Sequence, residues 1–297
     1  MFSNHIYDVV IDTDAANETD DQFALIYALA AEDVINVKAV YAAPFKHYRV
    51  LDENEGMENS YWEIKKILSF FEHRKVSAFK GARKFLSESE TQKNEAVNDL
   101  IERAEEYSSE KPLLVVAIAS LTNIATAISI APHIAEKIVL LWLGAQKYDS
   151  NPNEFNLEQD VKAAQIVFDS NIKMILFPCN GVSEKLYLSL KEANDKLSSD
   201  NQLECFLKHR YIRHHTWSFG ELAEENQCLA IWDFAPIAYL INKDFCKTEL
   251  MYRPALLTKP LRWEHGKRKA LDVVCTDINR NAVFDDFYQR LKQLREL

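Results

Sequence analysis

The sequence VVIDTDAANETDDQFALIYAL, residues 9–29, contains a strand pattern followed by a helix pattern. It begins with a short apolar run and ends with apolar residues at helical spacing. Between the two stand four aspartates: Asp12, Asp14, Asp20 and Asp21. A buried strand, an acidic loop and a helix are therefore predicted in this order, which is the repeating unit of an α/β fold.

Two of these aspartates have a simple structural explanation. Thr19 followed by Gln22 is typical of a capping box and predicts a helix with Asp20 and Asp21 in its first turn. Acidic side chains there stabilise the helix dipole by about 0.3–1 kcal/mol each. The two earlier aspartates end a predicted strand, where aspartate is disfavoured, so they need another explanation. Crowded carboxylates repel, and a fold that gathers them supplies a cation, shares a proton or keeps them hydrated.

Apolar runs and helical patterns continue to alternate along the chain. Runs that are apolar at nearly every position suit strands buried on both faces of a parallel sheet. These runs are IYDVVI, VKAVYA, LLVVAIA, KIVLLWLG, IKMILF and ALDVVC. Stretches such as NSYWEIKKILSFFE have the amphipathic period of covering helices. We therefore predict an open, mostly parallel α/β sheet covered by helices, and the lack of repeats or a Pro/Gly linker predicts one domain over residues 1–297.

Composition excludes several classes of protein. The 297 residues are 47% hydrophobic and 27% charged, as in a soluble globular protein, and the formal net charge is −10. An acidic chain lacks the basic face of a nucleic-acid binder. No apolar run approaches the ~20 residues that a bilayer requires, and the N-terminus lacks a signal-peptide pattern. The five cysteines form no CxxC pair, so reduced thiols and a cytoplasmic location are expected.

Polar clusters follow the predicted strands where an α/β sheet binds its ligands. Such ligands lie beyond the carboxyl ends of the strands, in the loops that lead into helices. Besides the acidic loop, these clusters are SLTN at 120–123, KYDSNPNEFN at 147–156 and AIWDFAP at 230–236. Four loops are therefore expected to converge on one pocket.

Four segments in these loops resemble motifs of the inosine-uridine preferring nucleoside hydrolases. They are DTDAANETDDQFAL at 12–25, SLTNIATAI at 120–128, NEFNLEQDVKAAQIVF at 153–168 and WDFAPIAYL at 232–240. They occur in the family's order and span most of the chain, whereas one match alone would be a weak signal. The resemblance implies a nucleoside hydrolase-like α/β fold with its active site at the carboxyl ends of the strands.

The resemblance further implies an N-glycosidase that uses Ca²⁺ to hydrolyse ribonucleosides to ribose and free base. The implied ligands of the ion are Asp14, Asp21, Asp233 and the backbone carbonyl of Ile118. The implied ribose contacts are Asp20, Glu154 and Asn156. Asp14 is the implied catalytic residue, which removes a proton from the attacking water. Taken singly, each of these residues also fits a turn or a helix cap, so the prediction depends on their combination.

The sequence departs from the family's motifs at three loops. The turn AANET between Asp14 and Asp20 is longer than usual and lacks Pro and Gly. The segment between Gly144 and Glu154 is shortened. YAAPF stands after the second strand, where the family has Gly-Asn, so an asparagine near the ribose is missing.

The leaving-group side of the pocket also departs from the family. Trp232 stands where many relatives have a histidine that protonates the departing base. An indole cannot deliver that proton, but it can stack on a purine, with a core position as the alternative. In FLKHRYIRHHTWSFG, residues 206–220, Tyr211 and His215 share a helix face and are predicted to contact the base, with surface positions as the alternative. Because Trp232 can stack on a purine, purine nucleosides are the favoured substrates.

Two other functions stay open. VVIDTDAAN imitates the strand-borne DxD nucleophile of Mg²⁺-dependent phosphatases, although Ala16 stands where that class has a hydroxyl residue. A non-catalytic or repurposed ribosyl-binding protein on the same scaffold fits the missing asparagine and histidine, whereas the intact aspartate set favours catalysis. The expected partner is a small nucleoside, not nucleic acid or membrane, and the resemblance implies a homodimer or homotetramer.

Overall fold

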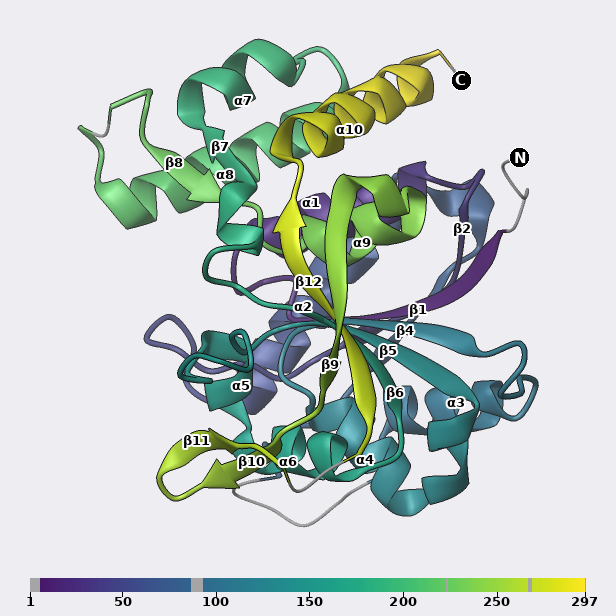
Figure 1. Ribbon diagram of the computed structural model, residues 1–297. Coiled ribbons are helices and arrows are strands. Elements are labelled where there is room, and N and C mark those ends of the chain that lie inside the picture. The colour runs from purple at the N-terminus through teal and green to yellow at the C-terminus, as the bar shows by residue number, and fades with distance from the viewer. Residues whose placement is uncertain (1–5, 87–92, 223, 267–268, 297) are drawn as a thin grey trace.

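The computed structural model describes residues 6–86, 93–222, 224–266 and 269–296. Its centre is an eight-stranded sheet in the order β3-β2-β1-β4-β5-β6-β12-β9 (Figure 1). The strands are β1 (Tyr7–Thr13), β2 (Ile35–Ala42), β3 (Ser77–Lys80), β4 (Leu113–Ile118), β5 (Ile138–Leu143), β6 (Lys173–Phe177), β9 (Cys246–Tyr252) and β12 (Leu271–Ile278). Neighbouring strands are parallel, except that β9 is antiparallel to β12. The predicted open, mostly parallel α/β sheet is confirmed, and the predicted apolar runs form β1, β2, β4, β5, β6 and β12.

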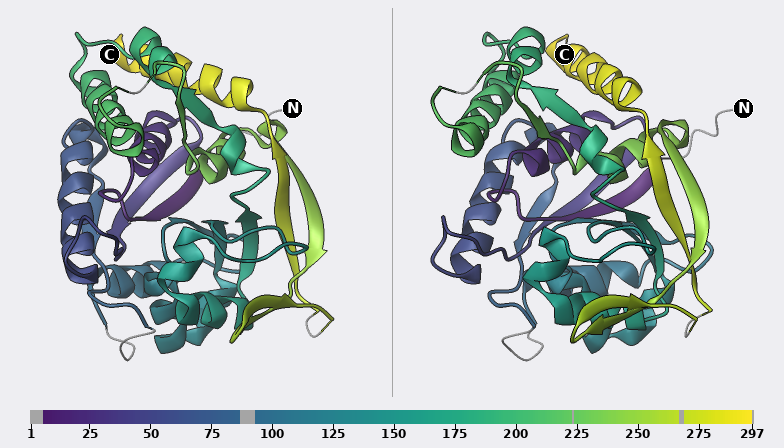
Figure 2. Two further views of the ribbon diagram at one scale, coloured as in Figure 1. Left: turned by 90° about the vertical axis from the view of Figure 1, so that its left-hand side faces the viewer. Right: turned by 60° about the vertical axis from the view of Figure 1, so that its left-hand side comes forward.

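Helices cover both faces of this sheet (Figures 1 and 2). One face carries α1 (Asp20–Ala30), α2 (Glu53–Leu68), α9 (Phe234–Ile241) and α10 (Arg280–Arg295). The other face carries α3 (Glu95–Ala104), α4 (Thr122–Ile130) and α6 (Val161–Asp169). Among the described helices, none is long and apolar enough to span a membrane.

Smaller elements surround the two main layers. Three more helices are α5 (Phe155–Gln159), α7 (Leu190–Lys196) and α8 (Gln202–Phe219). Two antiparallel strand pairs are β7 (Tyr187–Ser189) with β8 (Cys228–Ala230), and β10 (Ala255–Thr258) with β11 (Leu261–Glu264). Single 3₁₀ turns cover Glu72–Arg74, Pro132–Glu136, Ser183–Lys185 and Lys243–Phe245. All five cysteines are free thiols, as expected.

Strand β1 separates two hydrophobic clusters because its side chains alternate between the faces of the sheet. Val9 and Ile11 belong to the cluster under α1 and α9, whereas Val10 belongs to the cluster under α3 and α4. All three side chains are fully buried. Burying a side chain of this size contributes about 1.5–3 kcal/mol, so a one-residue slip of β1 would be costly. The register of β1 therefore fixes where its acidic end lies.

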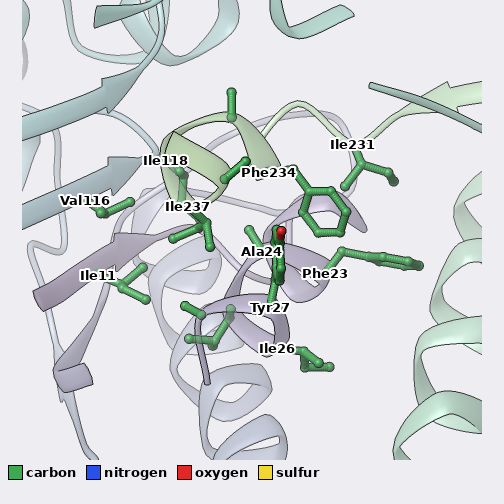
Figure 3. Packing of buried hydrophobic residues seen from close by; sticks show 14 of the residues in the cluster. Ile11, Phe23, Ala24, Ile26, Tyr27, Val116, Ile118, Ile231, Phe234 and Ile237 are labelled. Carbon is green, nitrogen blue, oxygen red and sulfur yellow. The ribbon is translucent and has the colours of Figure 1, made fainter. Parts of the chain in front are cut away.

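Helix α1 is buried along nearly its whole length, which fixes the acidic loop ahead of it. The ring centroids of Tyr27 in α1 and Phe234 in α9 lie 4.9 Å apart (Figure 3). Phe287 of α10 lies 5.4 Å from Tyr27, whose hydroxyl donates to Asp286 at 2.7 Å. Aromatic pairs of this kind contribute about 0.5–1.5 kcal/mol beyond their burial. Helix α1 is thus held against two helices from the C-terminal third of the chain.

The predicted capping box at the start of α1 is wrong, although the helix begins at Asp20 as predicted. Thr19 has φ −85° and ψ −20°, which are helical values, and its side chain makes no capping hydrogen bond. A capping side chain needs an extended backbone to reach back over the first turn. Gln22 instead donates from Nε2 to the carbonyl of Ala15 at 2.9 Å. Gln22 therefore connects the helix to the acidic loop.

Candidate active site

A cavity of about 400 Å³ lies at the carboxyl ends of the central strands. Its walls come from the loops after β1, β5 and β6, from Ile118 at the end of β4 and from the segment that enters α9. Three of the four predicted loops therefore meet at the cavity, whereas no residue of SLTN at 120–123 lines it. Eight of the predicted site residues line it: Asp14, Asp20, Asp21, Ile118, Glu154, Asn156, Trp232 and Asp233. The structure thus brings together residues that lie up to about two hundred positions apart in the chain.

Three buried carboxylates face one another in this cavity. One oxygen from each of Asp20, Asp21 and Asp233 lies within 4.8 Å of the other two. None of the three residues is more than 5% exposed. Burial raises the pKa of all three carboxyls well above its ordinary value, and neighbouring carboxylates raise it further. Positive charge placed among the three groups would therefore favour their ionised forms.

The donor set of this trio fits a divalent cation. Oxygens that each lie about 2.3–2.6 Å from one Ca²⁺ ion can be at most about 5 Å apart, which matches the spacing of the trio. All the donors are oxygens, and hard cations prefer oxygen ligands. The predicted carboxylate ligands are Asp14, Asp21 and Asp233. The trio instead contains Asp20 in place of Asp14, which lies beside it.

Asp14 is held next to the trio by hydrogen bonds. Its Oδ2 accepts from Nδ2 of Asn17 at 3.1 Å. Burial raises the pKa of Asp14, and the charge of Asp20 raises it further, whereas a hydrogen bond with Asp21 lowers it. Thr13 Oγ1 donates to Oδ1 of Asp21 at 2.5 Å. The orientations of Asp14 and Asp21 are therefore set by uncharged donors from the end of β1 and from the loop that follows it.

Asp12 serves the scaffold rather than the cavity. Its Oδ1 accepts from Nδ2 of Asn123 at 2.8 Å, and Oδ1 of Asn123 accepts from the N–H of Ala82 at 2.8 Å. Burial raises the pKa of Asp12 to about 7, and the hydrogen bond from Asn123 lowers it. The LTN segment thus connects the ends of β1 and β4 with the loop after β3.

Glu154 and Asn156 reach the cavity through the short helix α5. Glu154 caps this helix, since its carboxylate accepts from the backbone N–H groups of Asn156 and Leu157 at 2.9 and 3.1 Å. It also accepts from the N–H of Ala145 at 2.7 Å. Burial raises its pKa to about 6, against the effect of these hydrogen bonds. Nδ2 of Asn156 donates to the carbonyl of Leu143 at 3.1 Å, so the end of β5 positions both residues.

Trp232 lies between the hydrophobic core and the cavity. It is partly buried against the hydrophobic cluster under α1 and α9. It also lines the cavity next to Asp233. One side of the indole is thus supported by the core while the ring contributes to the wall of the pocket.

The structure does not place Tyr211 and His215 in the cavity, which contradicts their predicted contact with the base. Tyr211 is fully buried, and its hydroxyl donates to the carbonyl of Leu188 and accepts from the N–H of Leu229. His215 is 1% exposed and packs on Tyr211, with Nε2 3.1 Å from the carbonyl of Gln227. Both residues therefore join α8 to the β7–β8 pair.

The neighbouring histidine approaches the acidic loop instead. His214 Nδ1 accepts from the N–H of Thr19 at 3.3 Å. Burial lowers the pKa of His214 to about 4, and the charges of Arg49 and His215 act in the same direction. His214 is therefore neutral at pH 7 and supports the turn ahead of α1.

Sequence reasoning missed other polar residues of the cavity. Asn17 lines it from the variant turn, and Gln146 and Asn180 line it from the loops after β5 and β6. Oε1 of Gln146 accepts from the N–H of Asn180 at 2.9 Å, and its Nε2 donates to the carbonyl of Asn153 at 3.3 Å. The signal available for Asn17 was its place inside an unusual turn between predicted ligands. Gln146 and Asn180 stand in no motif, so the sequence offered no signal for them.

The fold and the site define an α/β protein with a carboxylate-lined pocket at the carboxyl ends of its strands. Residues 9–290 match the sequence model of the inosine-uridine preferring nucleoside hydrolases. The chain belongs to this family, whose members are N-glycosidases. A probable ribonucleoside hydrolase of Dictyostelium discoideum is 27% identical over 198 residues, which are 59% of this chain and 56% of that protein. The chain therefore matches little more than half the length of this curated relative.

Solved structures share the fold along nearly the whole chain. A plant nucleoside hydrolase superposes with a TM-score of 0.77 over 96% of this chain and 98% of its own. The purine-preferring ribonucleoside hydrolase from Gardnerella vaginalis superposes with a TM-score of 0.75 over 97% of this chain and 98% of its own. An inosine-guanosine nucleoside hydrolase superposes with a TM-score of 0.75 over 98% of this chain and 99% of its own. Each is 18% identical to this chain, so the likeness establishes the fold.

Proposed function

We propose that this protein is a Ca²⁺-dependent ribonucleoside hydrolase that releases free base and ribose, with a preference for purine nucleosides. The observation that carries the proposal is the buried trio of Asp20, Asp21 and Asp233 beside Asp14, in a member of a nucleoside hydrolase family. Two of the similar structures are described as purine-preferring and inosine-guanosine enzymes, which agrees with the purine preference. A cytoplasmic location and a homo-oligomeric state stay predictions.

In the proposed mechanism, Asp14, Asp21, Asp233 and the carbonyl of Ile118 would hold the cation. When bound, the cation supplies positive charge that attracts hydroxyl and water oxygens. Asp14 accepts the proton that the attacking water loses. Asp20, Glu154 and Asn156 bind the ribose hydroxyls and fix the sugar for attack at its anomeric carbon.

The charge distribution of the pocket matches the charge that develops during this reaction. As the bond between sugar and base breaks, positive charge grows on the ribose, and buried carboxylates stabilise it. Trp232 stacks on the base but donates no proton. The departing base therefore takes its proton from solvent.

The experiment that tests this proposal is a reducing-sugar assay on the purified protein. Inosine, guanosine, uridine and cytidine are each supplied with Ca²⁺ and then with excess chelator. The expected result is sugar release that chelator abolishes, with purine nucleosides turned over faster than pyrimidine nucleosides. Phosphate release from a phosphoester without sugar release would favour the phosphatase alternative, and tight ribose binding without turnover would favour the binding-protein alternative.

Replacing Trp232 by alanine is expected to lower kcat/KM for inosine about tenfold more than for uridine. The purine loses a larger stacking surface, and stacking contributes about 0.5–1.5 kcal/mol beyond burial. Steady-state kinetics of both substrates measure the ratio. Trp62→Ala serves as the matched control, because Trp62 is exposed on α2 and does not line the cavity. Equal losses for inosine and uridine would refute the stacking role.

Ca²⁺ is expected to raise the thermal stability of chelator-treated protein. At a concentration 100 times the Kd, binding contributes about 2.7 kcal/mol, which corresponds to a Tm increase of roughly 4 °C for a chain of this size. Because protons compete for carboxylates whose pKa values are raised, the increase should shrink as the pH falls. Differential scanning calorimetry measures it, with Asp233→Asn losing the increase and the exposed Asp195→Asn retaining it. A wild-type Tm that ignores Ca²⁺ would contradict the proposed metal site.

A further inference from the structure

The variant turn between Asp14 and Asp20 contains Asn17, to which the family resemblance assigns no role. Asn17 lines the cavity and is 5% exposed. Its backbone N–H donates to the carbonyl of Asp14 at 2.7 Å, which closes a tight turn. The side chain is thereby folded back over the catalytic aspartate instead of extending into solvent.

The two ends of the Asn17 amide have different environments. Nδ2 donates to Oδ2 of Asp14 at 3.1 Å. Oδ1 is buried and has no hydrogen-bond donor among the residues that the structure describes. Leaving a buried amide oxygen without a donor destabilises the fold, so the place of Oδ1 in a ligand cavity points to a donor on the ligand.

The loop after β2 supplies no such group. Ala43, Pro44 and Phe45 are buried, and none of them lines the cavity. The N–H of Ala43 donates to the carbonyl of Thr13 at 2.9 Å, so this loop contributes backbone support to the end of β1. Among the described cavity residues, Asn17 is the one whose side-chain amide donates to Asp14.

Arg49 fixes the turn that presents Asn17. Its Nη2 donates to the carbonyl of Asn17 at 2.6 Å. The guanidinium lies 4.2 Å from the ring centre of Trp217 and hydrogen-bonds His47 through Nε at 3.0 Å. A planar cation held by an aromatic ring and an imidazole keeps its geometry well, because its donors are pre-organised. The turn is therefore a supported element, and its amide has a defined direction.

We infer that Asn17 positions the substrate: its N–H group orients Asp14, and its carbonyl oxygen accepts a hydrogen bond from one ribose hydroxyl. The inference rests on the proposed function in that it takes the sugar of a ribonucleoside as the ligand. It assigns to the acidic turn the amide that is missing after the second strand. Asn17 acts on the reaction through Asp14 and through the orientation of the sugar.

The test is sugar binding, measured by calorimetry on the full chain with excess Ca²⁺. D-ribose and its 2-deoxy, 3-deoxy and 5-deoxy forms are titrated into the wild type, Asn17→Ala and Asn17→Ser. Loss of one hydrogen bond to ribose is expected to weaken its binding about tenfold in both variants. For one of the deoxy sugars, the wild type and the variants should bind equally, since that sugar lacks the contacted hydroxyl. Asn226→Ala, on an exposed turn, is the matched control and should bind all four sugars as the wild type does.

Each outcome decides the inference separately from the proposed function. If Asn17 has a merely structural role, its replacement would weaken the binding of all four sugars by the same factor, and that result would overturn the inference. Equal sugar affinities in every protein, or no ribose binding by the wild type, would also overturn it. Far-ultraviolet circular dichroism confirms that the variants are folded, and the serine variant replaces the alanine variant if the latter unfolds. The reducing-sugar assay is run on the same proteins. Ribose binding that depends on Asn17 without nucleoside turnover would refute the proposed function alone, whereas turnover with unchanged sugar binding in Asn17→Ala would refute the inference alone.

Discussion

Replacing Asp14 by asparagine is expected to lower kcat for inosine by about 10²–10⁴-fold, the range for loss of a general base. Asparagine has nearly the same shape, and its side-chain oxygen can still accept from Nδ2 of Asn17, so the turn keeps its geometry. It cannot accept a proton from water, and it removes one negative charge from the cation site. Single-turnover measurements with excess enzyme separate this chemical step from product release.

The same variant should also bind Ca²⁺ more weakly, because Asp14 lies beside the carboxylate trio. Isothermal titration of chelator-treated protein measures the loss. Asp195→Asn provides the control, since Asp195 is exposed on α7 and changes the net charge by the same amount. Turnover within threefold of the wild type in Asp14→Asn would remove Asp14 from the mechanism.

Replacing Arg253 by alanine costs about 3–5 kcal/mol of unfolding free energy, the range for breaking a buried ion pair. Nη2 of Arg253 lies 2.6 Å from Oδ1 of Asp272, and its Nε lies 2.9 Å from Oδ2. Arg253 is 2% exposed and Asp272 is fully buried. Among the residues that the structure describes, the variant would leave the Asp272 carboxylate with only the hydroxyl of Tyr148, which donates at 2.5 Å. The carbonyl of Ile172, which accepts from Nη2 at 2.6 Å, would also lose this donor.

Urea unfolding followed by circular dichroism measures this loss. Lys191→Ala is the matched control, because the Lys191–Asp195 pair is exposed at both ends and such pairs contribute about 0–0.5 kcal/mol. The double variant Arg253→Met with Asp272→Leu should recover part of the loss, since it leaves no buried charge. A single-variant loss below about 1 kcal/mol would show that water reaches Asp272.

The ion pair also bears on the active site. Tyr148 stands in the loop after β5 that leads to Glu154, and its hydroxyl connects this loop to Asp272 of β12. Burial raises the pKa of Tyr148 well above its ordinary value, and the charge of Asp272 raises it further. The phenol therefore stays protonated and donates its hydrogen bond. The short loop between Gly144 and Glu154 is thus held to the sheet by a hydrogen bond to a buried carboxylate.

Local patterns predicted the sheet and the convergence of its loops well. A run such as LLVVAIA is typical of a strand that is covered on both faces of a parallel sheet. Because parallel strands run in the same direction, the loops that follow them lie at one edge of the sheet. Family motifs placed Asp14, Asp233 and Glu154 in the same pocket for the same reason. The match of residues 9–290 to the nucleoside hydrolase family confirms the resemblance.

Side-chain direction was the part that the sequence could not supply. Neighbouring residues of a helix point about 100° apart, so a small rotation of α8 puts His214 at the acidic loop and His215 in the core. The capping box failed because Thr19 has helical dihedral angles. The pairing of Arg253 with Asp272 has no sequence period, since it depends on how β9 and β12 meet in the sheet. The single-domain organisation over residues 1–297 stays a prediction.

The strand order also sets a hazard during synthesis. β6 pairs with β5 on one side and with β12 on the other, but β12 is made much later in the chain. At translation rates of about 5–20 residues per second, roughly 5–20 s pass between the appearance of Phe177 and of Leu271. Throughout that interval the apolar edge of β6 offers unpaired backbone groups to any neighbouring chain. Nascent chains of this protein therefore leave this edge open to pairing with other chains until β12 emerges.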